Sequence, residues 1–290
     1  MNSAETARDQ LAWNYRNYRP LIVNVALTGT VPQKVDHPAL PVTPEEIAEE
    51  VRRCALQGAQ VFHLHMRDGS GEPTQDQKLF EETILLIRDS APDVMLCVTT
   101  SSRASKDLQD RLSPLLLTGK AKPDLASLSL GSFNFPASIS KNSPSQIELL
   151  AQTMAEKGIV PELEVFEPGM LTTAHTLRAN GFLPEKFIVN ILLGNKGTSS
   201  ATAQALNPFL SQLSDDSEWA LAGIGRFQRK TMMMGIALGG NIRIGMEDDP
   251  VGDGSGTWSN EKAVQLAASM AELAGRPLAT VEEARQRLLS

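Results

Sequence analysis

Short apolar runs alternate with longer amphipathic stretches along almost the whole chain, and this alternation constrains the fold more than any other feature. It is typical of parallel strands joined by crossover helices. The clearest helix is Pro44–Leu56, where Thr43 and Glu46 form a capping box at the start and Gly58 supplies the left-handed exit. We expect strands at Leu21–Leu27, Gln60–Met66, Val94–Thr100, Leu125–Gly131, Val160–Phe166, Phe187–Leu193, Trp219–Ile224 and Asn241–Glu247. Further helices are expected at Lys78–Asp89, Pro144–Lys157, Ala201–Leu213 and Asn260–Ala274.

Eight strands and eight crossovers with no leftover apolar segment predict an α/β fold, a closed (β/α)8 TIM barrel within one domain of residues 20–290. An open doubly wound sheet stays compatible with the pattern, because sequence does not show closure. Residues 1–19 are expected to form an N-terminal arm outside the barrel, and Ala279–Leu289 a short C-terminal helix. The arm carries Trp13, Tyr15 and Tyr18, which pack either on their own barrel or, as we favour, on a neighbouring subunit.

Charge and cysteine content exclude several classes of function. The 290 residues include 27 Lys and Arg against 34 Asp and Glu, a net charge of −7, and no basic block is present. Nucleic acid and anionic membranes are therefore not expected as partners. No apolar run is long enough to span a membrane, and the first 19 residues lack the apolar region of a signal peptide. With only two cysteines, a disulfide framework is not expected, so we predict a cytoplasmic protein.

The pair His63 and His65 stands at the end of the second predicted strand. Catalytic groups of barrels come from the carboxyl ends of strands, and the strand period of two aims both imidazoles to one side. Imidazole is the commonest protein ligand for zinc and its neighbours. We therefore predict a divalent metal site, the alternative being two hydrogen-bonded polar side chains with no metal.

The last predicted strand adds charged residues to this end of the barrel. Alternation places Arg243, Gly245 and Glu247 on one face. Charged side chains facing a barrel interior are costly unless paired or metal-bound, so Glu247 is expected as a third metal ligand. Asp248 has the opposite parity but can turn over the mouth, and Arg243 can fix a carboxylate or orient Asp248. The alternative is a structural Arg243–Glu247 pair that braces the core.

Other strand ends are polar as well. Thr99, Thr100 and Ser129 end the third and fourth predicted strands, and Thr99 and Ser129 are the better candidates for hydrogen bonds to substrate. The fifth strand carries Glu162 and Glu164 on one face, and two acids of like parity need a cation or a shared proton. We assign these five residues to substrate binding.

Several motifs, in order along the chain, strongly resemble the β-keto acid cleavage enzymes, the 3-keto-5-aminohexanoate cleavage family. The similar segments are Val25-Ala26-Leu27-Thr28-Gly29, Leu40-Pro41-Val42-Thr43-Pro44-Glu45-Glu46-Ile47-Ala48, His63-Leu64-His65-Met66-Arg67-Asp68, Pro161-Glu162-Leu163-Glu164-Val165-Phe166, Gly239-Gly240-Asn241-Ile242-Arg243-Ile244-Gly245-Met246-Glu247-Asp248 and Ala279-Thr280-Val281-Glu282-Glu283-Ala284-Arg285. They extend from about residue 20 to the end of the chain.

The resemblance implies a zinc-dependent barrel, a homotetramer, that condenses a β-keto acid with acetyl-CoA as co-substrate to give acetoacetate and a new acyl-CoA. It implies that His63, His65 and Glu247 bind the zinc and that Asp248 is the base, with Arg243 as its partner. Thr99 takes the position of a hydroxyl that contacts substrate. No redox cofactor is required.

Three positions depart from the family pattern: Asn241 where His is common, Asp249 where Asn is common, and Val31 where an acid would be expected beside an amine. Val31 argues against a keto acid that carries an amino group. Glu162 and Glu164 keep a cationic substrate possible.

Three rival functions remain. An amidohydrolase-type enzyme also uses His-x-His, but it normally recruits histidines from later strands, and after His65 only His175 remains, in a predicted helix. A metal-dependent aldolase would act on a keto acid without CoA. A barrel kept as a binding protein would not need Arg243, Glu247 and Asp248 together.

Overall fold

Eight parallel strands close into a barrel in the computed structural model, which describes residues 18–184, 187–214 and 217–289. Neighbours follow chain order, and the last strand pairs with the first, Asn24 lying opposite Arg243. The predicted TIM barrel is confirmed, and the open sheet is excluded. The barrel strands are β1 (Val23–Ala26), β2 (Val61–Leu64), β5 (Met95–Val98), β6 (Leu125–Ser129), β9 (Val160–Val165), β10 (Ile188–Leu193), β11 (Glu218–Gly223) and β12 (Asn241–Ile244).

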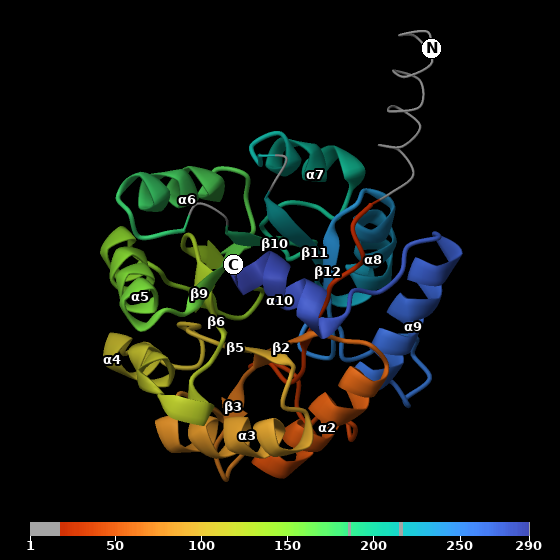
Figure 1. The fold of residues 1–290 in the computed structure, drawn as a ribbon, viewed down its shortest axis with the longest axis horizontal. Helices are drawn as coiled ribbons and strands as arrows, with labels where there is room; N and C mark the ends of the chain where they lie inside the picture. The colour runs from red at the N-terminus through yellow and green to blue at the C-terminus, as the bar shows by residue number, and fades with distance from the viewer. Residues whose placement is uncertain (1–17, 185–186, 215–216, 290) are drawn as a thin grey trace, which may run out of the picture.

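Helices form a ring around the strands (Figure 1). They are α2 (Pro44–Leu56), α3 (Gln77–Ser90), α4 (Leu108–Leu112), α5 (Pro144–Lys157), α6 (Met170–Ala179), α7 (Ala203–Leu210), α8 (Gln228–Ala237) and α9 (Asn260–Leu273), with short 3-10 turns η1 (Ser113–Leu116), η2 (Gly119–Ala121) and η3 (Gly225–Phe227). The capping box predicted for α2 is present, because Thr43 accepts a hydrogen bond from the Glu46 backbone and Glu46 accepts one from Thr43.

The C-terminal helix α10 (Val281–Leu289) crosses the centre of the ring in Figure 1. Its buried residues Ala284 and Leu288 pack against residues at the amino-terminal ends of strands, among them Ile22, Val61 and Met95. Thr280 and Glu283 form the predicted capping box. The helix therefore closes the amino-terminal end of the barrel and leaves the carboxyl end for a site.

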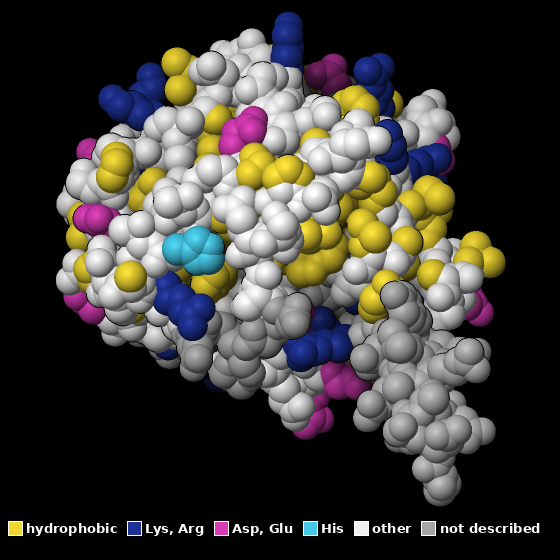
Figure 2. Space-filling model, turned by 90° about the horizontal axis from the view of Figure 1, so that it is seen from above, with side chains coloured by type: hydrophobic (Ala, Val, Ile, Leu, Met, Phe, Trp, Pro, Cys, Tyr) yellow, Lys and Arg dark blue, Asp and Glu magenta, His cyan; other side chains and the backbone are white. Residues whose placement is uncertain are grey.

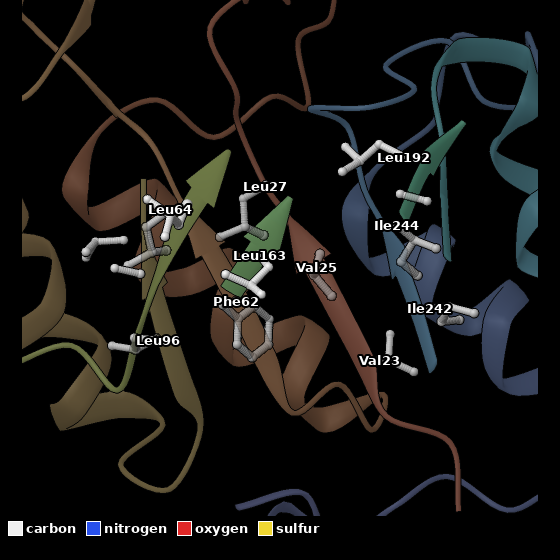
Figure 3. Packing of buried hydrophobic residues seen from close by; sticks show 14 of the residues in the cluster. Val23, Val25, Leu27, Phe62, Leu64, Leu96, Leu163, Leu192, Ile242 and Ile244 are labelled. Atoms are coloured by element: carbon white, nitrogen blue, oxygen red, sulfur yellow. The ribbon is translucent and has the colours of Figure 1, made fainter. Parts of the chain in front are cut away.

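The main core lies between the strands and the helices, because alternate strand residues point outward. Phe62 and Leu64 of β2, Val25 of β1 and Leu163 of β9 are fully buried there (Figure 3). Burying each such side chain stabilises the fold by about 1.5–3 kcal/mol. The residues between them, His63 in β2 for example, must point into the barrel.

Two hairpins extend the loops at the carboxyl ends of strands and were not expected from the sequence. The first pairs β3 (Met66–Arg67) with β4 (Pro73–Thr74) after β2. The second pairs β7 (Phe133–Asn134) with β8 (Ile139–Ser140) after β6. Strands of two residues carry too little alternation to be seen in a sequence.

The aromatic residues of the N-terminal arm are only partly described. Trp13 and Tyr15 lie outside the described residues, so their packing stays a prediction. Tyr18 contacts its own barrel: its ring lies 5.8 Å from the guanidinium of Arg276, and a Cβ atom at Gly239 would lie 2.6 Å from it. For Tyr18 the preference for a neighbouring subunit is not supported.

The surface carries charges of both signs. Figure 2 shows one face, on which Lys and Arg side chains lie in small groups among Asp, Glu and apolar side chains. Within the described part of the chain, no helix has both the length and the apolar character needed to cross a membrane.

Candidate active site

The imidazoles of His63 and His65 point to the same side, as the strand period predicted. His63 lies in β2 and His65 directly after it, and both are almost fully buried. Their Nε2 atoms lie 3.2 Å apart. Two ring nitrogens at this distance can share one proton or one metal ion.

Glu247 completes a cluster of three possible metal ligands. Its Oε1 lies 3.4 Å from Nε2 of His65, and its Oε2 lies 3.8 Å from Nε2 of His63. Two ligand atoms held at 2.0–2.1 Å by a tetrahedral zinc lie about 3.3 Å apart, close to these separations. Oε2 of Glu247 is also buried without a hydrogen-bond partner. The three residues therefore fit a divalent metal with a histidine and carboxylate ligand set.

The backbone that places Glu247 differs from the expectation. β12 ends at Ile244, so the predicted strand to Glu247 was too long. Gly245 has a φ of +135°, and a Cβ atom there would lie 2.2 Å from the carbonyl oxygen of Ala26. The chain turns at this glycine, and the backbone N–H of Glu247 donates to the same Ala26 oxygen at 3.1 Å. A turn tied to β1, rather than strand alternation, aims Glu247 at the histidines.

Arg243 connects the acids of the site. Its Nε donates to Asp248 Oδ2, its Nη1 to Glu164 Oε1 and its Nη2 to Glu247 Oε1, each at 2.9 Å. The expected contact with Asp248 is therefore present. The Arg243–Glu247 pair of the structural alternative exists as well, but it is part of a network that also reaches Asp248.

Burial and neighbouring charges divide the acids of this network. Burial raises the pKa of Asp248, and the negative charge of Glu247 adds to this effect against the attraction of Arg243. Burial also opposes ionisation of Glu247, but His65 and Arg243 outweigh it and hold its pKa well below the ordinary value. Glu247 is thus suited to bind a cation, and Asp248 to exchange a proton.

The two histidines are affected in opposite directions. Burial lowers the pKa of His65, which favours the neutral form that a metal requires. For His63, burial and Arg243 lower the pKa, but Glu247 and Glu162 outweigh them and raise it. A metal ion held by Glu247 and the two imidazoles would supply the positive charge that the carboxylates favour.

Glu162 was expected to contact substrate, and its position does not agree with this. It is 1% exposed and lies in the barrel below the histidines. Its carboxylate accepts hydrogen bonds from Asn24 and from the Cys97 thiol, and its Oε2 lies 3.3 Å from Nδ1 of His63. Same-face residues on one strand lie at different depths, and only Glu164 reaches the open end. Glu162 is placed to orient the His63 ring, as carboxylates behind metal-binding histidines do.

Of the three hydroxyl residues expected to bind substrate, two line the open end of the barrel and one does not. Thr99 and Ser129 line the cavity described below, and Ser129 donates to Oε2 of Glu164 at 2.8 Å. Thr100 does not line it, because its hydroxyl donates to the backbone oxygen of Ser127 at 2.6 Å. The parity that turns Thr99 inward turns Thr100 away.

A cavity of about 600 Å³ opens at the carboxyl ends of the strands, and we call it the mouth cavity. Its polar floor consists of His65, Thr99, Ser129, Glu164, Arg243, Glu247 and Asp248. Its wall includes Phe133, Phe135, Phe166, Leu192 and Ile224. Seven of the ten residues assigned to the site from sequence line this one space, and His63, Thr100 and Glu162 do not.

Several residues of the mouth cavity were not expected from the sequence. Arg103 follows the run of hydroxyl residues after β5, and Phe133 and Phe135 belong to the unexpected β7–β8 hairpin. Arg67 supports the cavity from behind, since its guanidinium donates to the backbone oxygens of Gly29 and Pro32. The only sequence signal for Arg67 was its place next to the histidine motif.

The departures from the family pattern also have defined places. Asn241 is at the amino-terminal end of β12, where it accepts from the Ile22 backbone and donates to Glu218, far down the strand from the ligands. Val31 lines the rim of the mouth cavity and is 67% exposed. Asp249 does not line the cavity, and its Oδ1 accepts from the Gly252 backbone.

Comparison with known proteins places the site in context. A family model described as beta-keto acid cleavage enzyme matches residues 20–289. A 3-keto-5-aminohexanoate cleavage enzyme of Fusobacterium nucleatum is 34% identical over 270 residues, covering 92% of this chain and 97% of the relative. A 3-oxoadipate:acetyl-CoA acetyltransferase of Cupriavidus necator is 33% identical over 274 residues, covering 93% and 95%. Among solved structures, apo ObcA matches with a TM-score of 0.73 at 21% identity, covering 86% of this chain and 65%, just under two thirds, of ObcA, and it supports the fold alone.

Proposed function

The chain belongs to the beta-keto acid cleavage enzyme family, and from this premise we propose a zinc-dependent enzyme that converts a β-keto acid and acetyl-CoA to acetoacetate and a new acyl-CoA. One observation carries the proposal: three possible metal ligands lie together, and two of them, His65 and Glu247, line the same mouth cavity as the Arg243–Asp248 pair. The metal ligands are His63, His65 and Glu247. When bound there, zinc would act as a Lewis acid toward the keto oxygen of the substrate.

The side chains supply the proton transfer and the orientation. Asp248 removes the proton between the keto group and the carboxylate, and Arg243 holds Asp248 in place through its Nε–H. The resulting carbanion attacks the acetyl carbonyl of acetyl-CoA, a carbon–carbon bond forms, and the CoA thiolate leaves. The thiolate then attacks the original keto carbon, and the old carbon–carbon bond breaks. The acyl-CoA forms, and the acetoacetate carbanion takes back the proton from Asp248.

The hydroxyl groups of the floor position the substrate in this proposal. Thr99 and Ser129 line the mouth cavity beside the acids. The Thr99 hydroxyl, which accepts from the Ser101 backbone, can donate to the substrate carboxylate, while Ser129 donates to Glu164 and Glu164 stays paired with Arg243. Removing a single such donor would weaken binding rather than abolish turnover.

Dependence on acetyl-CoA tests the proposal against a CoA-independent aldolase or hydrolase. We expect a panel of β-keto acids to yield acetoacetate only when acetyl-CoA is present, because the acetyl carbonyl of acetyl-CoA is the electrophile that the substrate carbanion attacks. The measurement is acetoacetate and acyl-CoA by mass spectrometry, with and without acetyl-CoA. Loss of keto acid at the same rate in both reactions, with no acyl-CoA formed, would exclude the proposed reaction.

Two further proposals concern the assembly and its place in the cell. We propose a homotetramer, as the resemblance implies, and a cytoplasmic location, in keeping with two buried free cysteines, Cys54 and Cys97. Sedimentation equilibrium should give the mass of four chains, and cell fractionation should recover the protein with the cytoplasmic fraction. A mass of one chain at micromolar concentration would contradict the tetramer.

A further inference from the structure

Arg103 is a cation in the mouth cavity that no acid neutralises directly. It lies in the loop after β5 and is partly buried, and its guanidinium stands 3.9 Å from the centre of the Phe135 ring. Within residues 18–184, 187–214 and 217–289, its guanidinium makes no hydrogen bond or ion pair. A guanidinium in such a place prefers a carboxylate, which it binds with two parallel hydrogen bonds.

The acids of the cavity floor are already engaged. Glu164, Glu247 and Asp248 each accept a hydrogen bond from Arg243 at 2.9 Å. They lie close enough to act on Arg103: burial lowers the pKa of Arg103, and these three acids partly offset the effect. None of them is in ion-pair contact with Arg103, so its five N–H donors remain available to a ligand.

The remaining charges lie at the rim. Asp36 and Lys196 line the mouth cavity but are exposed to solvent, where water screens them. Val31 occupies the rim position at which an acid would serve an amine. Glu162, the other acid that could have met a cationic substrate, lies below the cavity. Arg103 is therefore the partly buried charged group of the cavity that is available to bind a charged group of the substrate, and its charge is positive.

An apolar wall adjoins this charge. The rings of Phe133 and Phe166 stack with centroids 3.8 Å apart, and Phe135 meets Phe133 at 5.1 Å. Leu192 lines the cavity as well. A short methylene chain would find apolar contacts here, and the end of that chain would meet the guanidinium above Phe135.

We propose that Arg103 binds the distal carboxylate of a dicarboxylic β-keto acid, so that this enzyme prefers substrates with a negative charge at the end of the acyl chain. This inference rests on the proposed function, because it assigns one end of that substrate. Arg103 is thus a specificity-determining residue, and the proton transfer at Asp248 does not depend on it.

The test compares three substrates of similar length in the presence of acetyl-CoA: 3-oxoadipate, 3-oxohexanoate and 5-amino-3-oxohexanoate, whose distal ends are anionic, neutral and cationic. In the wild type, kcat/KM should be highest for 3-oxoadipate. Arg103→Met should lower kcat/KM for 3-oxoadipate by about 10- to 100-fold, the range of a charge-assisted hydrogen bond, and change 3-oxohexanoate by less than about threefold. Arg103→Lys should recover part of the loss.

Arg226→Met is the matched control, since Arg226 also lies over a phenylalanine, 5.1 Å from the Phe227 ring, but does not line the mouth cavity. It should leave all three values unchanged. An equal loss for all substrates in Arg103→Met would overturn the proposal, because Arg103 would then bind the carboxylate common to every β-keto acid. An increase confined to the KM of acetyl-CoA would overturn it too, by assigning Arg103 to the CoA phosphates.

A binding measurement separates this proposal from the proposed reaction. Calorimetric titration of the metal-loaded protein with adipate and with hexanoate needs no turnover. Tighter binding of adipate that is lost in Arg103→Met would support the subsite even if no keto acid were cleaved. Equal binding of the two acids by the wild type would reject the subsite even if acetyl-CoA-dependent cleavage were observed.

Discussion

Replacing His65 by alanine is expected to remove the bound metal and abolish turnover while the barrel stays folded. Nε2 of His65 lies 3.2 Å from Nε2 of His63 and 3.4 Å from Oε1 of Glu247, and the substitution leaves two of the three proposed ligands. Substitution of a residue that hydrogen-bonds to a metal ligand already lowers metal affinity by about 10- to 100-fold. We expect the loss of a ligand itself to exceed that range. His65 lies past the end of β2, so the strand pairing of the barrel remains.

Elemental analysis after dialysis and the thermal unfolding of the apo protein check this expectation together. His175→Ala serves as the control, because His175 is exposed on α6, away from the mouth cavity. It should keep metal content and activity. Full metal content in His65→Ala would refute the ligand assignment, and a collapse of apo-protein stability would show that His65 acts in folding instead.

Replacing Asp248 by asparagine is expected to keep the metal and the fold but to lower kcat by about 10²- to 10⁴-fold, the contribution of a positioned general base. The amide oxygen can still accept the hydrogen bond that Arg243 Nε donates to Asp248 Oδ2 at 2.9 Å. The substitution removes the capacity to take a proton, together with the negative charge and the longer contact of Arg243 Nη2 with Asp248 Oδ1. The family resemblance assigns the proton to Asp248, and burial agrees with this, since it raises the pKa of Asp248 while the pKa of Glu247 is held low.

Exchange of the α-protons of 3-oxoadipate with deuterated water, followed by proton NMR without acetyl-CoA, reports on this step alone. Wild type should exchange them faster than the uncatalysed reaction, and Asp248→Asn should not. Asp249→Asn is the neighbouring control, since Asp249 lies outside the mouth cavity and asparagine is the residue that the family resemblance implies there. Exchange at the wild-type rate in Asp248→Asn would assign the base elsewhere.

The sequence allowed the barrel and the direction of the histidines to be predicted, because both depend on periodicity. Apolar Phe62 and Leu64 must face the helices, so His63 between them must face inward. Depth along the barrel axis has no such signal. Glu162 and Glu164 share one face, yet one lies among Asn24 and Cys97 and the other lines the mouth cavity. Parity gives the side of a strand, and the depth depends on register with neighbouring strands.

Loop geometry was the other part that could not be predicted. Glu247 lies at the histidine cluster as expected, but strand alternation is not what places it there. A turn at Gly245 replaces the last residues of the expected strand. Arg103 and Phe135 come from loops after different strands, and they meet only because the β7–β8 hairpin folds over the mouth. A contact between two such loops depends on the path of each backbone, which local sequence patterns do not determine.

The pairing of β12 with β1 has a consequence for how the enzyme matures. Under the proposed ligand set, His63 and His65 leave the ribosome long before Glu247, and the three meet only when the last strand closes against the first. The nascent chain thus holds no complete metal site, in contrast to small zinc domains that fold around their ion. Under the proposed ligand set, metal binding would therefore follow closure of the barrel, and the ion would enter through the mouth cavity.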